Sequence, residues 1–384
     1  MNKINTLNYQ ICTRCVMDTS DPEIVFDEHG VCNHCREFDE ITRKRWFPNK
    51  EGERRLSEIV EKIKFLGRNQ AYDCILGLSG GVDSSYLALK VKGFGLRPLV
   101  VHVDAGWNSE LAVYNIEQVV NYCGFELHTH VMDWEEMKDL QAAYLRAEVA
   151  NQDVPQDHAF FASLYHFAVK NGIKYILSGG NIATEGVFPT AWLHSAMDAR
   201  NLHAIHRKYG KLPLRQYKTI NIAQYYFIYP LILKMKTVRP LNYMEYNKAA
   251  ALKLLKETVG YKEYERKHGE SLFTKFYQNY YLPKKFGFDK RRPHLSSMIL
   301  SGQISREEAL KILEQPLYDL QELESDMEYV AKKLGFTTDE LEKLTEPPGR
   351  HYSEYRNWDR TYYLLKKIQG VMETKLGRPF RNYS

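Results

Sequence analysis

The sequence predicts an α/β protein built on a doubly wound parallel sheet. Short apolar runs at 74–78, 97–103, 125–131 and 174–177 have the length and composition of buried strands, and helical patterns lie between them. Strands that alternate with helices form a parallel sheet with helices on both of its faces. A glycine-rich turn that directly follows the first of these strands adds a ligand site to the prediction.

This turn lies in the segment 72–86, which reads YDCILGLSGGVDSSY. After the apolar run comes the turn Ser79-Gly80-Gly81, and a helix is expected to begin at Asp83. Because glycine has no Cβ, successive backbone N–H groups can approach an anion at the positive end of that helix, and Ser79 and Ser84 add hydroxyl donors. The turn is therefore predicted to hold a polyphosphate.

The loop is not a Walker A motif, because no lysine follows the glycines and Asp83 stands in its place. A carboxylate beside phosphates requires a cation between them, so we expect Asp83 to bind Mg²⁺ against the pyrophosphate end of ATP. The string SGGVDSS resembles the PP-loop of the ATP pyrophosphatases, which cleave ATP between the α and β phosphates and transfer AMP to an oxygen of the substrate. The resemblance implies a fold similar to the adenine nucleotide alpha hydrolases. The alternative is a turn without a ligand.

Ligands of open α/β sheets lie beyond the carboxyl ends of the strands, so two further strand ends are predicted to border the nucleotide. One is His102-Val103-Asp104, where the resemblance implies the adenine edge and where His102 is equally well explained as a core histidine. The predicted catalytic residues are Asp83, Ser79 and Ser84. The predicted ATP contacts are Gly77, Leu78, Ser79, Gly80, Gly81, Asp83, Ser84, Val103, Asp104, Ser178 and Gly179.

The other strand end carries a second glycine-rich turn, Ser178-Gly179-Gly180-Asn181, after the strand at 174–177. Such a turn can approach the ribose and the α-phosphate, and PP-loop enzymes have a comparable turn at this place. Asn181, Thr184 and Glu185 are then expected to face the reacting centre as substrate contacts. A plain turn explains the same residues.

Two CxxC pairs near the N-terminus predict a zinc ribbon. Cys12 and Cys15 form the first pair, and Cys32 and Cys35 form the second after a spacer of 16 residues. Together they supply four thiolates for one tetrahedral Zn²⁺, and the segment between them reads as a hairpin with a turn at Gly30. Disulfides or a redox-active pair are the alternatives. His34 is expected to be a bystander.

The chain is divided by these patterns into three parts. They are a zinc ribbon at 1–45, a PP-loop ATP-binding α/β domain at 46–190, and a helical region at 191–384 that packs on the α/β domain. Helices are expected at 56–66, 111–123, 134–149, 157–172, 191–208, 222–234, 246–259, 272–281, 306–313, 317–334 and 352–376.

A basic stretch at 284–294 is the densest cluster of positive charge in the chain. Lys285, Arg291 and Arg292 are predicted to bind phosphates of ATP or of a nucleotide-linked sugar, since arginine suits bidentate contact. The alternative is a solvated basic face.

Composition limits the remaining function classes. The net charge of +5 and the pI of about 8.6 are mild, so an anionic small substrate explains the basic residues as well as nucleic acid does. No apolar run reaches the roughly 18 residues of a membrane span, and the first ten residues lack the apolar region of a signal peptide. We expect a cytoplasmic protein without a membrane partner.

Taken together, CTRCVMDTSDPEIVFDEHGVCNHC, the PP-loop, SGGN and YYLPKKFGFDKRRPHLSSMILSGQISREEAL resemble the N-acetyl sugar amidotransferase family. Its members act in the biosynthesis of surface polysaccharides such as the LPS O-antigen, or of pseudaminic-acid-type sugars. The resemblance implies conversion of an acetamido group of a nucleotide sugar to an acetamidino group, with ATP, Mg²⁺ and Zn²⁺. It also implies two partner proteins, a glutaminase and a synthase that channels ammonia.

Two other readings remain open. A tRNA-modifying PP-loop enzyme, a thiolase or a lysidine-type ligase, would also combine a zinc ribbon with a PP-loop, but it is expected to have a further cysteine pair or a strongly basic surface with pI above about 9. A zinc-ribbon interaction module without catalysis is disfavoured by the intact SGGVDSS.

Overall fold

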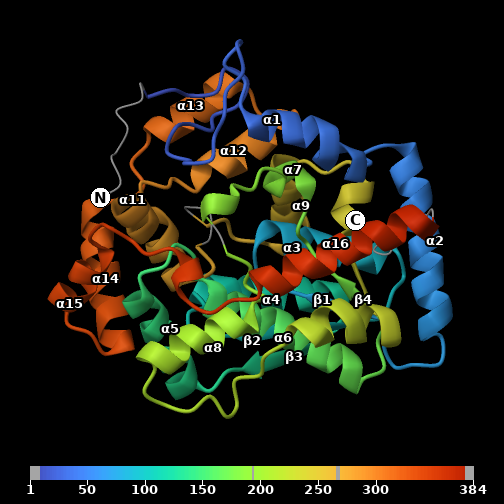
Figure 1. The fold of residues 1–384 in the computed structure, drawn as a ribbon. Helices are drawn as coiled ribbons and strands as arrows, with labels where there is room; N and C mark the ends of the chain where they lie inside the picture. Colours follow the sequence, from blue (N-terminus) through green and yellow to red (C-terminus); the bar gives the residue numbers. More distant parts are fainter. Residues whose placement is uncertain (1–8, 193, 265–268, 377–384) are drawn as a thin grey trace.

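The computed structural model describes residues 9–192, 194–264 and 269–376. Its centre is a five-stranded sheet in which every neighbouring pair is parallel, in the order β3-β2-β1-β4-β5. The strands are β1 Cys74–Gly77, β2 Pro98–Asp104, β3 Glu126–Val131, β4 Tyr175–Leu177 and β5 Lys236–Val238. The predicted doubly wound parallel sheet is thereby confirmed (Figure 1).

The two faces of the sheet are buried by different helices. Because side chains alternate along a strand, Cys74 and Leu76 of β1 lie in one apolar cluster and Ile75 lies in the other. The first cluster contains residues of α2 Lys50–Gly67, α3 Val82–Gly93, α4 Glu110–Cys123 and α9 Lys248–Val259. The second contains residues of α5 Trp134–Ala147, α6 Val154–Lys170 and α8 Ala199–Tyr209.

The rest of the described chain is largely helical and packs around one end of this sheet. One continuous stretch runs through α10 Leu272–Phe276, a π-helical turn Tyr277–Tyr281 and α11 Leu282–Phe286. The remaining helices are α7 Ile182–Glu185, α12 Arg291–Leu300, α13 Arg306–Glu314, α14 Leu320–Leu334, α15 Thr338–Thr345 and α16 Asp359–Leu376. Figure 1 shows α14 and α15 at one side of the molecule and α16 running across the front.

The N-terminal cysteine-bearing segment has little regular structure apart from α1 Asn33–Glu37. Two isolated antiparallel bridges, Ile11 with Asp18 and Phe26 with Cys32, hold it together, and Gly30 takes a positive φ of 74° at the predicted turn. It lies against α12 and α13 (Figure 1), where Val16 packs with Leu295 and Ala309.

One strand and several helix boundaries differ from the sequence predictions. The strand β5 lies at 236–238, inside the region expected to be helical, because three residues that include Lys236 and Thr237 carry no readable apolar pattern. The helix expected at 222–234 is a π-helix at Gln224–Ile232, and the one expected at 191–208 begins only at Ala199. The division at residues 45 and 190 stays a prediction, although β5 shows that the sheet uses sequence beyond residue 190.

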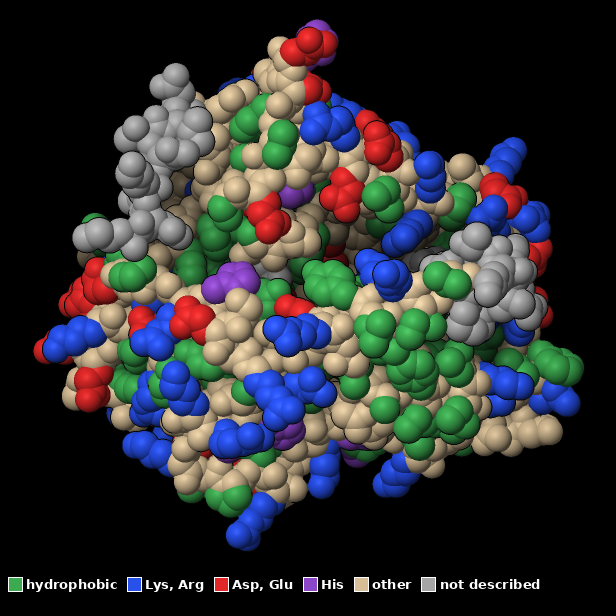
Figure 2. Space-filling view, in the orientation of Figure 1, with side chains coloured by type: hydrophobic (Ala, Val, Ile, Leu, Met, Phe, Trp, Pro, Cys, Tyr) green, Lys and Arg blue, Asp and Glu red, His purple; other side chains and the backbone are tan. Residues whose placement is uncertain are grey.

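None of the described helices is both long and apolar enough to cross a membrane. Apolar side chains do gather on the surface near α16 and the π-helix at 224–232, as the space-filling view shows (Figure 2). The exposed residues there are Phe227, Ile228, Leu231, Ile232, Tyr363, Leu364, Ile368 and Val371.

The central strand should dominate stability. Leu76 has no exposed surface, so Leu76→Ala is expected to lower the free energy of unfolding by about 2–5 kcal/mol. The matched change Leu320→Ala removes the same atoms from a side chain that is 82% exposed and should change it by less than about 0.5 kcal/mol. Urea denaturation measures both. Equal effects of the two substitutions would contradict the assignment of β1 to the core.

Candidate functional site

The strand order creates a crevice at the carboxyl ends of β1 and β4. The chain moves from β1 outward to β2 and β3 on one side, and from β4 outward to β5 on the other. Ligands of open α/β sheets bind at such a reversal of strand order. The loop Ser79-Gly80-Gly81 follows β1 and the turn Ser178-Gly179-Gly180 follows β4, so both predicted glycine turns border this crevice.

The first loop requires its glycines. Gly80 has φ of +84°, and a Cβ there would lie 2.9 Å from the backbone oxygen of Ala112. Its own carbonyl accepts hydrogen bonds from the hydroxyls of Tyr261 and Tyr264, at 2.8 and 3.0 Å. These two hydrogen bonds hold the Gly80 carbonyl in place, so the loop leads directly into the N-terminus of α3, where an anion can bind.

The two loop serines face each other. The hydroxyl oxygens of Ser79 and Ser84 are 3.1 Å apart, the Ser79 N–H donates to Ser84 Oγ at 3.3 Å, and the Gly81 N–H donates to Ser79 Oγ at 3.3 Å. Ser79 is exposed, whereas Ser84 is buried. Ser84 Oγ also donates to the carbonyl of Gly81 at 3.2 Å, so these groups satisfy one another in the described structure. An oxyanion that binds at the loop has to replace these internal hydrogen bonds with its own.

Asp83 lies in the first turn of α3 and receives a hydrogen bond from the hydroxyl of Tyr246. Burial, together with the negative charge of Asp83, raises the pKa of Tyr246, so this hydroxyl keeps its proton and stays a donor. One carboxylate beside a phosphate-sized loop is the donor set with which Mg²⁺ is held in nucleotide sites, where the phosphates supply further oxygens. The residues therefore fit the predicted magnesium ion.

The second turn packs directly on the first helix. A Cβ on Gly179 would lie 2.9 Å from the backbone nitrogen of Ser84, so only glycine allows this approach. The Ser178 N–H donates to the carbonyl of Val238 at 2.9 Å, which ties the turn to β5. The structure thus brings together the two turns that the sequence predicted separately.

Other predicted nucleotide contacts are used within the sheet. Leu78 is buried, its N–H donates to Val101, and its carbonyl accepts from His102 Nδ1 at 3.0 Å. Gly77 is buried against Phe160, and a Cβ there would lie 2.6 Å from that ring. In the described structure both residues therefore pack and hydrogen-bond at the end of the strand.

His102 is a core histidine. Burial lowers its pKa, so the imidazole is neutral, and its Nε2 accepts from the amide of Asn108 at 2.9 Å. Beside it, Val103 is buried and Asp104 accepts from the Gly106 N–H at 2.8 Å. Asp104 also lines a hollow of about 260 Å³ with Gly106, Val131, Met132, Trp134 and Lys333.

Two of the three predicted substrate contacts near the second turn have a structural task. Asn181 caps α7: its side-chain oxygen accepts from the N–H and the hydroxyl of Thr184, at 3.0 and 3.2 Å, and both residues are almost fully buried. Both side chains stabilise the start of the helix, and their contact with a substrate stays a prediction. Glu185, the last residue of α7, is exposed.

The three predicted phosphate-binding residues of the basic stretch are also structural. Lys285 is buried and binds Glu148 at 2.7 Å and the carbonyl of Leu344 at 3.0 Å. Arg291 pairs with Asp289 at 2.8 Å and also donates to backbone carbonyls at the end of α13.

Arg292 reaches the cysteine-bearing segment, where it donates to the carbonyl of Val16 at 2.8 Å and pairs with Asp18 at 3.0 Å. The donor groups of Lys285, Arg291 and Arg292 thus already bind nearby carboxylates and carbonyls, which composition alone does not reveal. That Lys285, Arg291 and Arg292 bind phosphate stays a prediction, and their contacts in the described structure are with protein groups.

Three charged residues that the sequence analysis did not single out stand at the crevice with Glu185. Arg239 directly follows β5, Lys290 precedes α12, and Asp157 lies in the first turn of α6. Arg239 was missed because β5 was missed. Lys290 belongs to the basic stretch that did attract attention, and Asp157 had only its place at the start of an expected helix as a signal.

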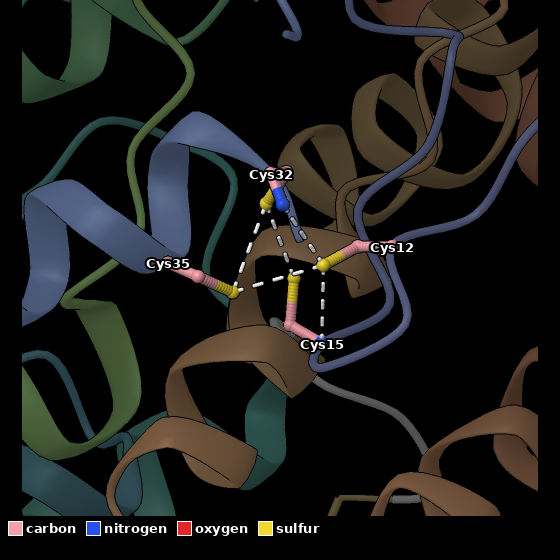
Figure 3. Close-up of side chains that lie close together, drawn as sticks. All are labelled: Cys12, Cys15, Cys32 and Cys35. Carbon is pink, nitrogen blue, oxygen red and sulfur yellow. Dashed lines mark hydrogen bonds between the residues drawn. The ribbon is translucent and has the colours of Figure 1, made fainter. Parts of the chain in front are cut away.

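The four N-terminal cysteines form one cluster, with sulfur atoms that lie within 4.8 Å of one another (Figure 3). The distances between Sγ atoms are 3.6 Å for Cys15 with Cys32, 3.7 Å for Cys32 with Cys35 and 3.8 Å for Cys12 with Cys35. Tetrahedral Zn²⁺ with Zn–S bonds of about 2.3 Å separates its sulfurs by about 3.8 Å. A disulfide needs a separation of about 2 Å, so these pairs are thiols.

Backbone N–H groups point at these sulfurs, as in a metal-binding knuckle. The N–H groups of Arg14 and Cys15 donate to Cys12 Sγ at 3.4 Å, and that of Cys32 donates to the same sulfur at 3.3 Å. His34 instead pairs with Asp21 at 2.6 Å, which agrees with its predicted role as a bystander. The donor set fits the predicted zinc ion.

Apart from the crevice, a cavity of about 360 Å³ lies between the cysteine-bearing segment, the α5–α6 connection and residues 349–352. Its walls are mostly apolar and aromatic, with Trp192, Phe286, Phe288 and Tyr352 among them. Asn151 also lines it. In the sequence, Asn151 is two residues from Asp153, and Phe288 is two residues from Lys290.

The cysteine cluster makes a prediction about metal content. The purified protein should carry about one Zn²⁺ per chain, and Cys12→Ser combined with Cys32→Ser should remove it, because two of four ligands are lost. Elemental analysis of both proteins measures this. The control Cys123→Ser changes a cysteine outside the cluster and should keep the metal. Equal zinc in the double variant and the parent would refute the site.

Comparison with known proteins adds one family. Residues 270–369 match the family described as "LPS biosynthesis protein WbpG-like, C-terminal domain". This segment includes Lys290 and the helices α10 to α15. No curated protein matches the chain.

Among solved structures, NMN synthetase from Francisella tularensis is similar over 57% of this chain and 98% of its own, with 13% identity and a TM-score of 0.25. Those values are too low to establish a shared fold. The family match agrees with the resemblance to enzymes of surface-polysaccharide biosynthesis. Residues 270–369 are therefore similar to the C-terminal domain of the WbpG-like LPS biosynthesis proteins.

Proposed function

We propose that the chain is an ATP-dependent enzyme of LPS biosynthesis that converts an acetamido group of a nucleotide-linked sugar to an acetamidino group. The observation that carries this proposal is the loop from Ser79 to Ser84 at the point where the strand order reverses, with Asp83 at its end. The family match over residues 270–369 supports the pathway.

The reaction needs activation because an amide carbonyl resists ammonia and its oxygen is a poor leaving group. The amide oxygen attacks the α-phosphorus of ATP, the bond from that phosphorus to the bridging oxygen breaks, and pyrophosphate leaves with the electron pair. Ammonia then forms a C–N bond at the amide carbon, and the C–O bond breaks so that AMP leaves with the former amide oxygen. The products are the amidinium, AMP and pyrophosphate.

The loop serves the first of these steps. In this proposal its N–H groups and the hydroxyls of Ser79 and Ser84 exchange their mutual hydrogen bonds for bonds to the departing pyrophosphate, at the positive end of α3. Asp83 would hold Mg²⁺, which offsets the negative charge on the phosphates. The hydrogen bond from Tyr246 fixes the direction of this carboxylate before a ligand arrives.

A partner must supply the ammonia in this proposal. A glutaminase of the thiol type needs a reactive thiolate, and the six cysteines of the chain offer none outside the metal cluster. Burial raises the pKa of Cys74 well above its usual range and that of Cys123 to about 11. We therefore infer a separate glutaminase, with a synthase that channels ammonia to this chain.

The nucleotide products distinguish the proposed chemistry from ordinary ATP hydrolysis. With a UDP-linked diacetamido sugar and ammonium, ATP should yield AMP and pyrophosphate, because the loop resembles the PP type and lacks the Walker lysine. Asp83→Asn should lower the rate at least about 100-fold by weakening metal binding. The control Asp339→Asn makes the same change on the exposed surface of α15 and should leave the rate unchanged. Chromatography decides the point, and ADP as the main product would rule the proposal out.

The source of ammonia makes a second prediction for the isolated chain. Ammonium salt at alkaline pH should support acetamidino-sugar formation, since free NH₃ is the nucleophile, whereas glutamine alone should not. Mass spectrometry of the sugar follows the gain of NH and the loss of oxygen. If the isolated chain used glutamine as well as it uses ammonium, the partner would be unnecessary and the assignment of Cys123 as inert would be wrong.

A further inference from the structure

Four charged side chains from distant parts of the sequence meet beside the loop. They are Asp157 from α6, Glu185 from the end of α7, Arg239 from the residue after β5, and Lys290 from the residue before α12. We call them the charged quartet. Lys290 comes from residues 270–369, which we call the WbpG-like region, and the other three members come from the α/β part of the chain.

Two members of the quartet lie close to Gly180. A Cβ at Gly180 would lie 3.5 Å from Glu185 Oε2 and 3.7 Å from Arg239 Nε. The two opposite charges thus flank one glycine, and both lie next to the turn that packs on Ser84. They face the same crevice as the phosphate loop.

Hydrogen bonds from His294 and Ser301 to the carbonyls of Thr184 and Ala183 hold α12, and with it Lys290, next to α7. The electrostatics of Lys290 and Asp157 agree with this placement. Burial lowers the pKa of Lys290, while the carboxylates of Asp153, Glu185 and Asp157 act to raise it. Desolvation by the surrounding protein raises the pKa of Asp157 to about 8, although its side chain keeps contact with solvent; the charges of Asp153 and Glu185 also raise this pKa, and that of Lys290 lowers it. Lys290 is therefore close to both quartet carboxylates. Glu185 in turn acts on Tyr246, which binds Asp83.

Within the described part of the chain, no quartet side chain makes a hydrogen bond or an ion pair. By contrast, Lys285 pairs with Glu148, and Lys275 pairs with Glu322 and Asp326. Asp157, Glu185 and Arg239 are solvent-exposed and Lys290 is half-buried, so these charges are open to solvent and to a ligand of opposite charge.

Hydrogen bonds join α7, which ends in Glu185, to the segment after β5 and to α12. The N–H of Ile182 at the start of α7 donates to Asn242 Oδ1 at 2.8 Å, beyond β5. At the other end, His294 Nδ1 donates to the carbonyl of Thr184 and Ser301 to that of Ala183, each at 2.8 Å. These hydrogen bonds join the elements that carry Glu185, Arg239 and Lys290.

We propose that Arg239 and Lys290 bind the phosphate of the AMP half of the nucleotide, and that Asp157 and Glu185 bind the cationic nitrogen end of the acceptor. This inference rests on the proposed function and divides its site into two halves. The phosphate of AMP stays anionic after pyrophosphate has left, so it matches the two cations. The acceptor becomes positive when its oxygen is adenylated and ends as an amidinium, so it matches the two carboxylates.

Binding of the two product halves separates the quartet from the loop without any acceptor sugar. Calorimetry with AMP and with Mg²⁺–pyrophosphate is the measurement. Arg239→Gln and Lys290→Met should each weaken AMP binding about tenfold or more, because each removes a charge-assisted hydrogen bond, and leave pyrophosphate within about twofold. Asp83→Asn should show the opposite pattern.

Matched controls exclude a general loss of structure. Lys174→Met removes an exposed cation at the opposite end of β4 and should bind both ligands as the parent does. Arg239→Lys should recover part of the AMP affinity, because the charge returns. Thermal melting of each variant confirms folding.

The outcomes distinguish this inference from the proposed function. If Asp83→Asn weakens pyrophosphate binding while both quartet variants bind AMP like the parent, the loop assignment stands and the inference is overturned. If Asp83→Asn leaves pyrophosphate binding unchanged while the quartet variants lose AMP, the proposed loop chemistry is wrong and the phosphate site of the quartet stands. Parent protein that fails to bind AMP at millimolar concentration overturns the inference.

The acidic half is tested with acetamidinium and its neutral isostere acetamide. Acetamidinium should tighten AMP binding by about threefold and acetamide should not, since only the former places a cation beside the carboxylates. The effect should grow as pH rises through about 8, because Asp157 becomes ionised there in the presence of Asp153, Glu185 and Lys290. Asp157→Asn should remove this pH dependence, and Glu185→Gln should weaken the effect. Glu117→Gln on the exposed face of α4 is the control. Equal effects of acetamidinium and acetamide would overturn this half.

Discussion

The close packing of Gly179 on the first turn of α3 is the constraint on which the site depends. At this contact the turn after β4 touches the backbone of Ser84, with no room for a Cβ. The contact holds the second turn against the phosphate loop, and with it α7, which follows the turn and ends in Glu185. Because β4 also pairs with β5, the same constraint sets the place of Arg239. The parallel pairing of β1 and β4 thus brings together two glycine-rich turns that are about a hundred residues apart in the sequence.

A second chain of contacts brings the WbpG-like region to this crevice. Arg306 donates to the carbonyls of Cys12 and Cys15, at 2.9 and 3.0 Å, and Arg292 binds Val16 and Asp18. These planar cations satisfy backbone carbonyls of the cysteine knuckle that would otherwise be buried without partners.

On its other side α12 holds the end of α7 through His294 and Ser301. The cysteine knuckle therefore supports the placement of Lys290 and Glu185, although it lies outside the crevice. Its role is that of a structural support for the site.

Sequence alone was sufficient where a local pattern has a single physical explanation. The buried strand, the turn SGGVDSS and the two CxxC pairs each specify their own geometry, and the sheet order and the cysteine cluster confirm them. It failed for β5, since three residues of mixed polarity carry no period, and Arg239 was lost with it. Within the basic stretch it selected Lys285, Arg291 and Arg292, because composition cannot show that nearby carbonyls and carboxylates already bind them. Lys290, in the same stretch, lacks such partners among the described residues.

The central claim is that one crevice holds the pyrophosphate at the loop and the AMP phosphate at the quartet. A crystal structure of the chain with AMP and Mg²⁺–pyrophosphate tests it most directly. The account predicts pyrophosphate within hydrogen-bond distance of Ser79 and Ser84, metal at Asp83, and the AMP phosphate between Arg239 and Lys290. AMP bound in the cavity of about 360 Å³ beside Trp192 and Phe288, with the quartet left untouched, would contradict it.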